Sequence, residues 1–265
     1  MKVVILNSTH RKQHFGCRLV TSAYEQLCEA RDIEIIARVA KRQLYDMAAL
    51  DKADLVIVNA EGSIHHGKNE LLLRAARRWP CVLINGSMEE LSEGSNAELA
   101  NFKLITVRES LTASCLHYEH GTYSEVVPDV IFAHAPELRK IDRTCAVGRF
   151  VSDSSSKTGP EHAPRVRQTN YVQELALSND ALLGRFHAIC CAAMMRVPFV
   201  AWRANTWKNT GLMMDMQNGL NYRPEYDAAK NLIESYGIEP NEMIDVYVDD
   251  AHRKVNELFD RIAEL

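Results

Sequence analysis

Long hydrophobic runs are missing from this sequence of 265 residues. No apolar stretch approaches the ~20 residues that a helix needs to cross a bilayer, so we expect no membrane partner. The apolar part of "MKVVILNSTH" at residues 1–10 is also too short for a secretory signal peptide. We therefore predict a cytoplasmic protein.

An excess of basic charge is missing as well. The formal net charge is −4 at pH 7, which gives the chain no overall electrostatic attraction for nucleic acid. This charge weighs against a DNA-binding protein without excluding one. Any contact with DNA would have to use a local basic patch.

Paired CxxC cysteines are absent, and the seven cysteines make an odd total. We expect reduced thiols in the core rather than a disulfide or zinc framework. Cys17 in "HFGC" stands out because it follows His14 near a predicted helix start, where the pKa of a thiol can fall. The composition, 46% hydrophobic and 25% charged, is that of a globular chain with one large domain or two smaller ones.

Strand and helix patterns alternate through the first half of the chain. Short apolar strands are predicted at 3–7, 33–39, 53–62, 81–86, 103–109 and 125–130, with helical spacing between most of them. This βαβ rhythm is typical of a parallel sheet.

A polar, proline-containing stretch at 132–144 predicts a linker, after which a second βα series begins. Strands are predicted at 145–153, 171–178, 181–183 and 198–202, and helices at 185–195 and over most of the last 40 residues. The polar loop after the first of these strands either contacts ligand or is mobile. The fold class is therefore α/β, with Rossmann-like domains at 1–137 and 138–265 whose parallel sheets face a central cleft.

Polar residues that follow strands are the candidates for the site, because ligands bind at the carboxyl ends of parallel strands. "NAEGSIHH" places Glu61, Gly62 and His65 at such a point. Glu61, His65 or His14 can serve as general base toward a hydroxyl, and Gly62 permits close backbone approach. A structural turn with solvated histidines is the alternative. We expect no metal here, because no ligand cluster accompanies the adjacent histidines.

Arg108 in "TVRES" follows the fifth predicted strand. It can clamp a phosphate or a carboxylate of a bound ligand, or it can form a structural ion pair, and the sequence leaves both possibilities open. For Asp129 in "VPDV", a structural role is favoured.

The most specific pattern is "GRFH" followed by "NTWK". Arg185 and His187 lie at a predicted helix start, where backbone N–H groups favour anions. Arg185 and His187 can therefore bind a diphosphate, and Asn205 and Lys208, which follow the next strand, can reach the same cleft. Capping and salt-bridging by Arg185 and His187 is the alternative.

Taken in order, "EGSIHH", "RES", "PD", "GRFH" and "NTWK" resemble the polysaccharide pyruvyl transferase family over nearly the whole chain. The resemblance implies a GT-B-like fold with an N-terminal acceptor domain and a C-terminal donor-binding domain. It implies transfer of a pyruvyl ketal from phosphoenolpyruvate or, in some branches, of a sugar from a nucleotide donor. It also assigns Arg185 and His187 to the donor phosphate, and Glu61 with Gly62 to the "EG" turn.

The sequence departs from that family in two respects. "HFGC" stands where many members carry Gly-Asp after the first strand, and the chain is shorter than most bacterial members. Both features resemble a compact phage branch, some of whose members modify hydroxymethylated pyrimidines in DNA. If the chain is phage-encoded, its location would be the host cytoplasm.

Three functions remain open at this point. The first is a metal-independent, cofactor-free transferase that uses a UDP-type sugar donor. The second is a pyruvyl transferase that uses phosphoenolpyruvate, and the third is a nucleotide-binding module without chemistry. For a DNA acceptor, the candidate basic patches are "HRK" at 10–12 with Arg18, and Arg74, Arg77 and Arg78 beside a tryptophan in "RAARRW". The alternative is that these are solvated helix faces.

Overall fold

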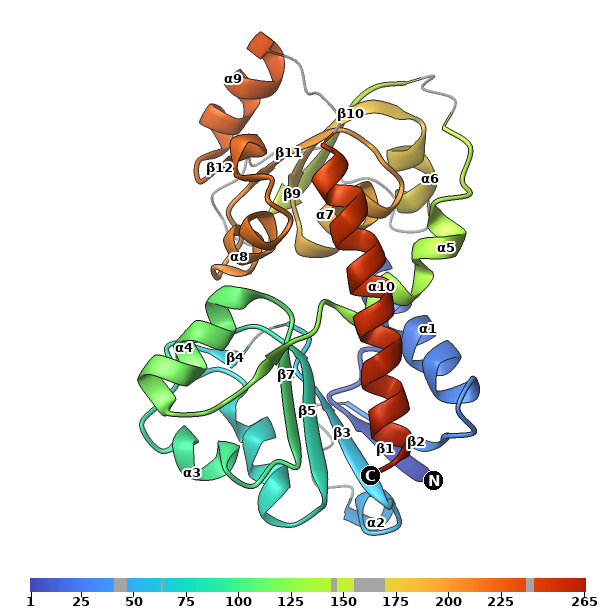
Figure 1. The fold of residues 1–265 in the computed structure, drawn as a ribbon, viewed down its shortest axis with the longest axis vertical. Helices are drawn as coiled ribbons and strands as arrows, with labels where there is room; N and C mark the ends of the chain where they lie inside the picture. Colours follow the sequence, from blue (N-terminus) through green and yellow to red (C-terminus); the bar gives the residue numbers. More distant parts are fainter. Residues whose placement is uncertain (41–46, 63, 144–146, 155–169, 237–240) are drawn as a thin grey trace. The chain divides into compact units, whose positions relative to one another are not determined.

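A computed structural model describes the chain except residues 41–46, 63, 144–146, 155–169 and 237–240 (Figure 1). Most of the predicted polar loop after the first strand of the second series therefore lies outside the described residues. The described chain divides into two compact units. Unit 1 comprises Met1–Lys12, Val20–Val130 and Arg253–Leu265, and unit 2 comprises Gln13–Leu19 and Ile131–His252. A short segment near the N-terminus, 13–19, thus belongs to unit 2, and the C-terminal segment 253–265 belongs to unit 1. The sequence instead suggested a single boundary after residue 137.

Unit 1 is built on a six-stranded parallel sheet with strand order β2-β1-β3-β5-β7-β8. Its strands are β1 (Lys2–Leu6), β2 (Glu34–Val39), β3 (Leu55–Asn59), β5 (Cys81–Gly86), β7 (Leu104–Val107) and β8 (Glu125–Val126). Every residue of β3 and β5 is buried, which explains why their sequences are continuous apolar runs rather than alternating ones. The predicted six-stranded parallel sheet is confirmed.

Helices connect these strands. They are α1 (Phe15–Glu29), α2 (Met47–Leu50), α3 (Ser95–Leu99), α4 (Ser110–His120) and the 3₁₀ helix η2 (Glu70–Arg77), and a small parallel pair, β4 (Ile64–His65) and β6 (Met88–Glu89), accompanies them. Glu109 starts α4 as its N-cap, because its side chain accepts a hydrogen bond from the backbone N–H of Thr112 at 2.9 Å. Gly121 ends α4 in the left-handed conformation.

Unit 2 contains a four-stranded parallel sheet with strand order β12-β11-β10-β9. Its strands are β9 (Val147–Ser154), β10 (Ser178–Gly184), β11 (Phe199–Trp202) and β12 (Tyr222–Arg223). Its helices include α6 (Tyr171–Ala176), α7 (Phe186–Met194), α8 (Lys208–Asp215), η4 (Gly219–Asn221) and α9 (Tyr226–Tyr236), and α10 (Glu242–Ala263) begins in this unit. Two parallel sheets with helical connections confirm the predicted α/β class.

Two sequence-based assignments in unit 2 are wrong. The strand predicted at 171–178 is helix α6 followed by the first residue of β10, and Tyr171 and Leu175 are its buried residues at helical spacing. The linker predicted at 132–144 contains the end of η3 (Val130–His134) and all of α5 (Ala135–Leu138). Pro136 lies in the first turn of α5, where a missing N–H costs nothing.

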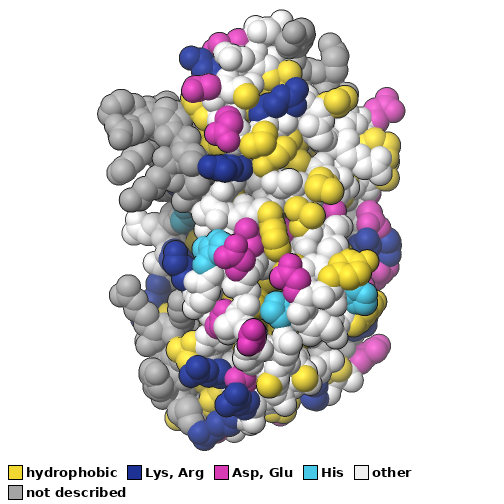
Figure 2. Space-filling view, turned by 90° about the vertical axis from the view of Figure 1, so that its left-hand side faces the viewer, with side chains coloured by type: hydrophobic (Ala, Val, Ile, Leu, Met, Phe, Trp, Pro, Cys, Tyr) yellow, Lys and Arg dark blue, Asp and Glu magenta, His cyan; other side chains and the backbone are white. Residues whose placement is uncertain are grey.

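The described surface carries both signs of charge. Figure 2 shows acidic and basic side chains interspersed on one face of the molecule. No helix among the described residues is long and apolar enough to cross a membrane.

Candidate functional site

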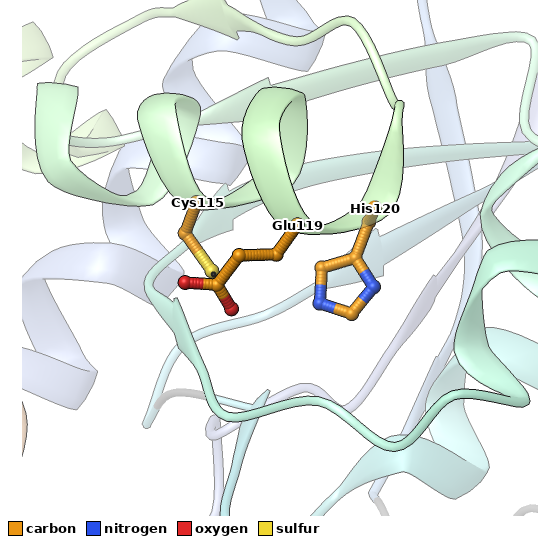
Figure 3. A group of neighbouring side chains, drawn as sticks. All are labelled: Cys115, Glu119 and His120. Atoms are coloured by element: carbon orange, nitrogen blue, oxygen red, sulfur yellow. Dashed lines mark hydrogen bonds between the residues drawn. The ribbon is translucent and has the colours of Figure 1, made fainter.

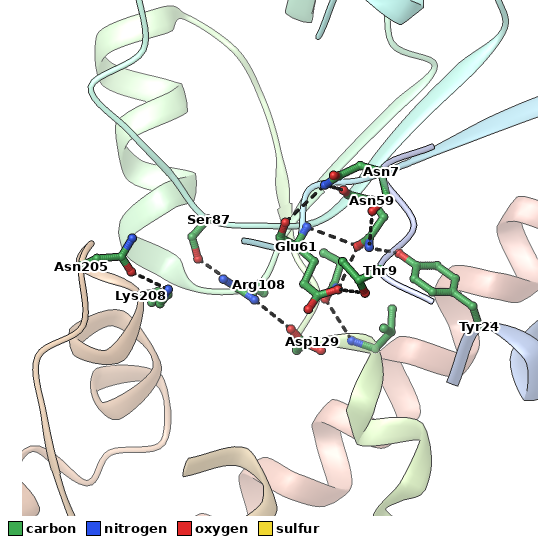
Figure 4. A network of polar contacts seen from close by, with 12 residues as sticks. Asn7, Thr9, Tyr24, Asn59, Glu61, Ser87, Arg108, Asp129, Asn205 and Lys208 are labelled. Carbon is green, nitrogen blue, oxygen red and sulfur yellow. Dashed lines mark hydrogen bonds and ion pairs between the residues drawn. The ribbon is translucent and has the colours of Figure 1, made fainter. Parts of the chain in front are cut away.

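Three buried asparagines, Asn7, Asn59 and Asn85, lie at the carboxyl edge of the sheet in unit 1, and Figure 4 labels Asn7 and Asn59. The amide nitrogen of Asn7, after β1, donates to the backbone carbonyl of Asn59 at 2.7 Å. The side-chain oxygen of Asn59 accepts from the amide of Asn85 and from the hydroxyl of Tyr24, each at 3.2 Å. Sequence reasoning did not select these residues, although "VVILN", "LVIVN" and "VLIN" place an asparagine at or beside the end of three strands.

The predicted base Glu61 lies beside this asparagine network. Its side chain is 6% exposed, and Oε2 accepts a hydrogen bond from the Thr9 hydroxyl at 2.6 Å. The Asn7 amide also contacts the backbone carbonyl of Glu61 at 3.3 Å. Gly62 follows with φ +90°, a conformation that side-chain-bearing residues rarely adopt. The local backbone therefore holds the Glu61 carboxylate in a defined position.

The two histidines of "SIHH" have different surroundings. His65 is buried in β4, and its backbone exchanges two hydrogen bonds with Lys68. His66 is partly exposed, and its Nδ1 lies 2.5 Å from Oε2 of Glu90. His65, which the sequence proposed as an alternative base, is thus the more enclosed of the pair.

Arg108 forms a buried ion pair at the same edge of the sheet. Its Nη1 lies 3.0 Å from Oδ2 of Asp129, and the two side chains are 2% and 0% exposed. The Arg108 Nε also donates to the Ser87 hydroxyl at 2.9 Å. Removing one partner of such a pair costs about 3–5 kcal/mol, because the other charge is left buried. This contact matches the structural alternative for Arg108 rather than the phosphate clamp.

In unit 2, Arg185 lies between β10 and α7. It is the N-cap of α7 with extended backbone, and its Nη1 lies 2.9 Å from Nε2 of His14. The backbone N–H of Gly16 points at the other ring nitrogen of His14, Nδ1, at 3.2 Å, so the two contacts compete for the single lone pair of a neutral imidazole. His14 therefore belongs to the Arg185 group in unit 2, whereas Glu61 and His65 belong to unit 1.

His187 packs against the backbone of Gly16. The His187 side chain lies in the first turn of α7 and is 9% exposed, and its ring centroid is 6.5 Å from that of His14. A Cβ at Gly16 would lie 2.2 Å from the Nδ1 atom of His187, which only glycine avoids. The glycine of "HFGC" thus has a packing role that the sequence did not indicate.

Asn205 and Lys208 come from the segment that follows β11. The Lys208 Nζ donates to the Asn205 side-chain oxygen at 2.7 Å (Figure 4), and Lys208 is 7% exposed as the first residue of α8. The neighbouring Asn209 donates to the carbonyls of Gly184 and Trp202 at 3.0 and 2.8 Å. Asn209, which sequence reasoning missed, therefore joins the carboxyl ends of β10 and β11, where the segments with Arg185 and Lys208 begin.

The arginines of "RAARRW" lie toward the amino ends of the strands in unit 1, opposite the carboxyl ends where Glu61 lies. They belong to η2 and the turn that leads into the amino end of β5. Arg77 pairs with Glu98 at 2.7 Å, and Arg78 pairs with Asp51 at 3.3 Å. Arg74 is exposed on η2. By contrast, Arg11 and Lys12 are exposed shortly after the carboxyl end of β1.

Comparisons with known proteins place the fold. No protein-family model and no curated protein matches the chain. The solved structure of the uncharacterized protein KP1_0663 from Klebsiella pneumoniae subsp. pneumoniae NTUH-K2044 has a TM-score of 0.57 and 11% identity, over 80% of this chain and 87% of that one. An α-glucosyltransferase in complex with UDP and a 13-mer DNA containing an HMU base has a TM-score of 0.50 and 8% identity, over 98% and 95%. The chain has a GT-B fold.

This likeness confirms the predicted GT-B-like architecture. At 8–11% identity it shows the fold alone. The resemblance to the polysaccharide pyruvyl transferase family has no matching family model and stays a hypothesis.

We predict that Gly16→Ala destabilises unit 2 by roughly 1–3 kcal/mol, because the added methyl group forces the His187 ring to move. The free energy of unfolding in urea is the measurement. Gly148→Ala is the matched control, since a Cβ there meets nothing within 4 Å. Equal unfolding free energies for the two variants would contradict the close packing of Gly16 against His187.

Proposed function

We propose that this protein transfers a sugar from a UDP-type nucleoside-diphosphate donor to a hydroxyl acceptor. The observation that carries the proposal is the group formed by Arg185, His187 and His14 where β10 leads into α7. The N-terminus of a nine-residue helix attracts anions, and a guanidinium adds charge-assisted hydrogen bonds. The GT-B neighbour whose structure contains UDP and DNA supports this choice of donor.

The proposed chemistry depends on stabilising the negative charge that develops on the leaving diphosphate. When the bond between the sugar and the diphosphate breaks, negative charge grows on the departing phosphate oxygen. Arg185, His187 and the first N–H groups of α7 stabilise that charge, and Lys208, held by Asn205, adds a second cation. These groups supply positive charge themselves, so the proposal requires no metal ion and no cofactor.

Glu61 is the proposed general base. A carboxylate oriented by the Thr9 hydroxyl can accept the proton of the acceptor hydroxyl as that oxygen attacks the sugar. The hydrogen bond from the Asn7 amide to the Glu61 carbonyl and the asparagine network around it keep Glu61 in place. Unit 1 is then the acceptor side and unit 2 the donor side of the reaction.

The proposed acceptor is a hydroxymethylated pyrimidine in DNA. Support comes from the neighbour's DNA complex and from the exposed Arg11 and Lys12 at the carboxyl edge of the unit 1 sheet. Phosphoenolpyruvate is the competing donor, because the same group would also bind a single phosphate. Thermal stabilisation by UDP, set against stabilisation by phosphoenolpyruvate, separates the two. A ligand at 100 times its dissociation constant adds about 2.7 kcal/mol to the folded state.

We predict that Arg185→Ala weakens UDP binding by about 10- to 100-fold, because one charge-assisted hydrogen bond is lost. Isothermal titration calorimetry measures this change. Arg196→Ala is the matched control, since Arg196 lies just past the other end of α7 and pairs with Asp245. The phosphate role fails if Arg185→Ala binds UDP normally but unfolds at a much lower temperature.

We predict that Glu61→Gln lowers kcat by at least ~100-fold while UDP binding persists, because the amide keeps the shape of the side chain but cannot accept the proton. Steady-state kinetics with a fixed acceptor is the measurement. Glu90→Gln, at the exposed partner of His66, is the control. Near wild-type turnover of Glu61→Gln would assign the base to His65 or His14.

Charge reversal tests the acceptor. We predict that Arg11→Glu with Lys12→Glu reduces sugar transfer to hydroxymethylated DNA more than it reduces donor hydrolysis, and that DNA binding weakens steeply with salt. Reversal at Arg74, Arg77 and Arg78 tests the other basic candidates in the same assay. An enzyme that ignores such DNA with every UDP-sugar, yet transfers pyruvyl from phosphoenolpyruvate to a saccharide, is a pyruvyl transferase instead.

A further inference from the structure

The last turns of α4 carry a second group of reactive side chains, in the segment "CLHYEH". Cys115, Glu119 and His120 each offer one ligand atom, and these atoms all lie within 4.8 Å of one another. Figure 3 shows the three side chains on the same side of the helix. None of them belongs to the proposed transfer site, although all lie in unit 1.

The imidazole of His120 is held in one orientation by Asn96 of α3. Its Nδ1 lies 2.6 Å from the side-chain oxygen of Asn96. That oxygen only accepts, so the proton is on Nδ1 and the lone pair is on Nε2. The Nε2 atom is buried, and among the described residues it has no hydrogen-bond partner. Metal-binding histidines are held in this way, with one ring nitrogen donating to an oxygen and the other directed at the ion.

Cys115 is the sulfur donor of the group. Its side chain is buried, and its thiol lies 3.5 Å from Oε2 of Glu119, to which it donates. Burial, reinforced by the charge of Glu119, raises the pKa of Cys115 to about 12. Without a cation the thiol is therefore protonated at neutral pH and is a poor nucleophile. A bound cation would replace that proton, which is released to solvent.

We propose that Cys115, Glu119 and His120 form a binding site for a divalent transition-metal ion, with Zn²⁺ as the best match. One sulfur, one nitrogen and one carboxylate oxygen suit an ion of intermediate softness, whereas Mg²⁺ and Ca²⁺ prefer oxygen alone. Zn–S and Zn–N bonds of about 2.3 and 2.0 Å place ligand atoms roughly 3.5 Å apart in a tetrahedral site. The exposed Glu119 side chain can rotate to bring the group to that spacing.

Three protein ligands leave the fourth position of a tetrahedral ion for water or an outside ligand. The ion would also lie at the carboxyl end of α4, where the helix dipole favours positive charge. Through His120 and Asn96 it would fix the end of α4 to α3. The site thus goes beyond the proposed transfer reaction and does not depend on it. It also differs from the sequence-based expectation, which considered a zinc framework among the cysteines and a metal at the histidine pair 65–66 and predicted neither.

The test uses the full chain after treatment with a chelator. Zn²⁺ affinity is measured by competition with a chromophoric chelator, and Co²⁺ is used as a spectroscopic probe of thiolate ligation. The wild type should bind one Zn²⁺ at this site with release of a proton and show a sulfur-to-cobalt charge-transfer band. Cys115→Ser should abolish that band, and His120→Gln should weaken Zn²⁺ binding by at least ~100-fold. Asn96→Ala should weaken it by about 10- to 100-fold, because it removes only the support of the His120 ring.

His117→Gln is the matched control, since His117 is exposed on the same helix and is not one of the three ligands. It should leave Zn²⁺ affinity and the cobalt band unchanged. Urea unfolding of the metal-free variants shows whether each is folded, and Zn²⁺ should raise the melting temperature of the wild type but not of Cys115→Ser. A cobalt band that persists in Cys115→Ser, or equal Zn²⁺ affinity for the wild type and His120→Gln, would overturn the proposal.

Discussion

The architecture of unit 1 depends on one buried carboxamide, that of Asn59. Parallel strands that end at the same edge leave polar backbone groups and side chains away from solvent, and each needs a hydrogen-bond partner. The Asn59 side-chain oxygen accepts from Asn85 and Tyr24, and its backbone carbonyl accepts from Asn7. These contacts join the ends of β1, β3 and β5 into one rigid platform. The loop that carries Glu61 starts from this platform.

In unit 2 a second asparagine, Asn209, joins strand ends in the same way. The Asn209 amide donates to the last residues of β10 and β11, Gly184 and Trp202, and so joins two strand ends from a position on a helix. In both units a carboxamide serves well because it offers donors and an acceptor without a net charge. A carboxylate at either position would place an uncompensated charge in the interior.

The sequence predicted local features of this protein better than long-range ones. Continuous apolar runs identified the strands of unit 1, and "GRFH" correctly predicted that Arg185 and His187 lie at the start of a helix. Tyr171–Ala176 was misassigned because a six-residue helix carries too few turns to reveal its period. Pro136 was taken as a break because its place within the first turn of α5 is not visible until the helix is known.

Several residues of the site escaped sequence reasoning for a different physical reason. Gly16 matters through a side chain 171 positions further along the chain, and Asn59 matters through residues 26 and 52 positions away. Their roles arise from packing, which spacing within one segment does not report. The Asn at or beside the end of three neighbouring strands, β1, β3 and β5, was the one available signal. Cys115 and His120 were overlooked in the same way, because "CLHYEH" reads as part of an ordinary helix until Asn96 is brought beside it.

Two arginines lie at comparable places in the two units but in different environments. Arg108 and Arg185 both follow a strand and precede a helix. Arg108 lies 3.0 Å from a fully buried carboxylate, so an incoming phosphate would have to compete with a negative charge already in place. Arg185 instead contacts the imidazole of His14, so this contact involves no carboxylate. The charge of Arg108 is thus compensated inside unit 1 by Asp129, whereas donor binding by Arg185 stays a proposal.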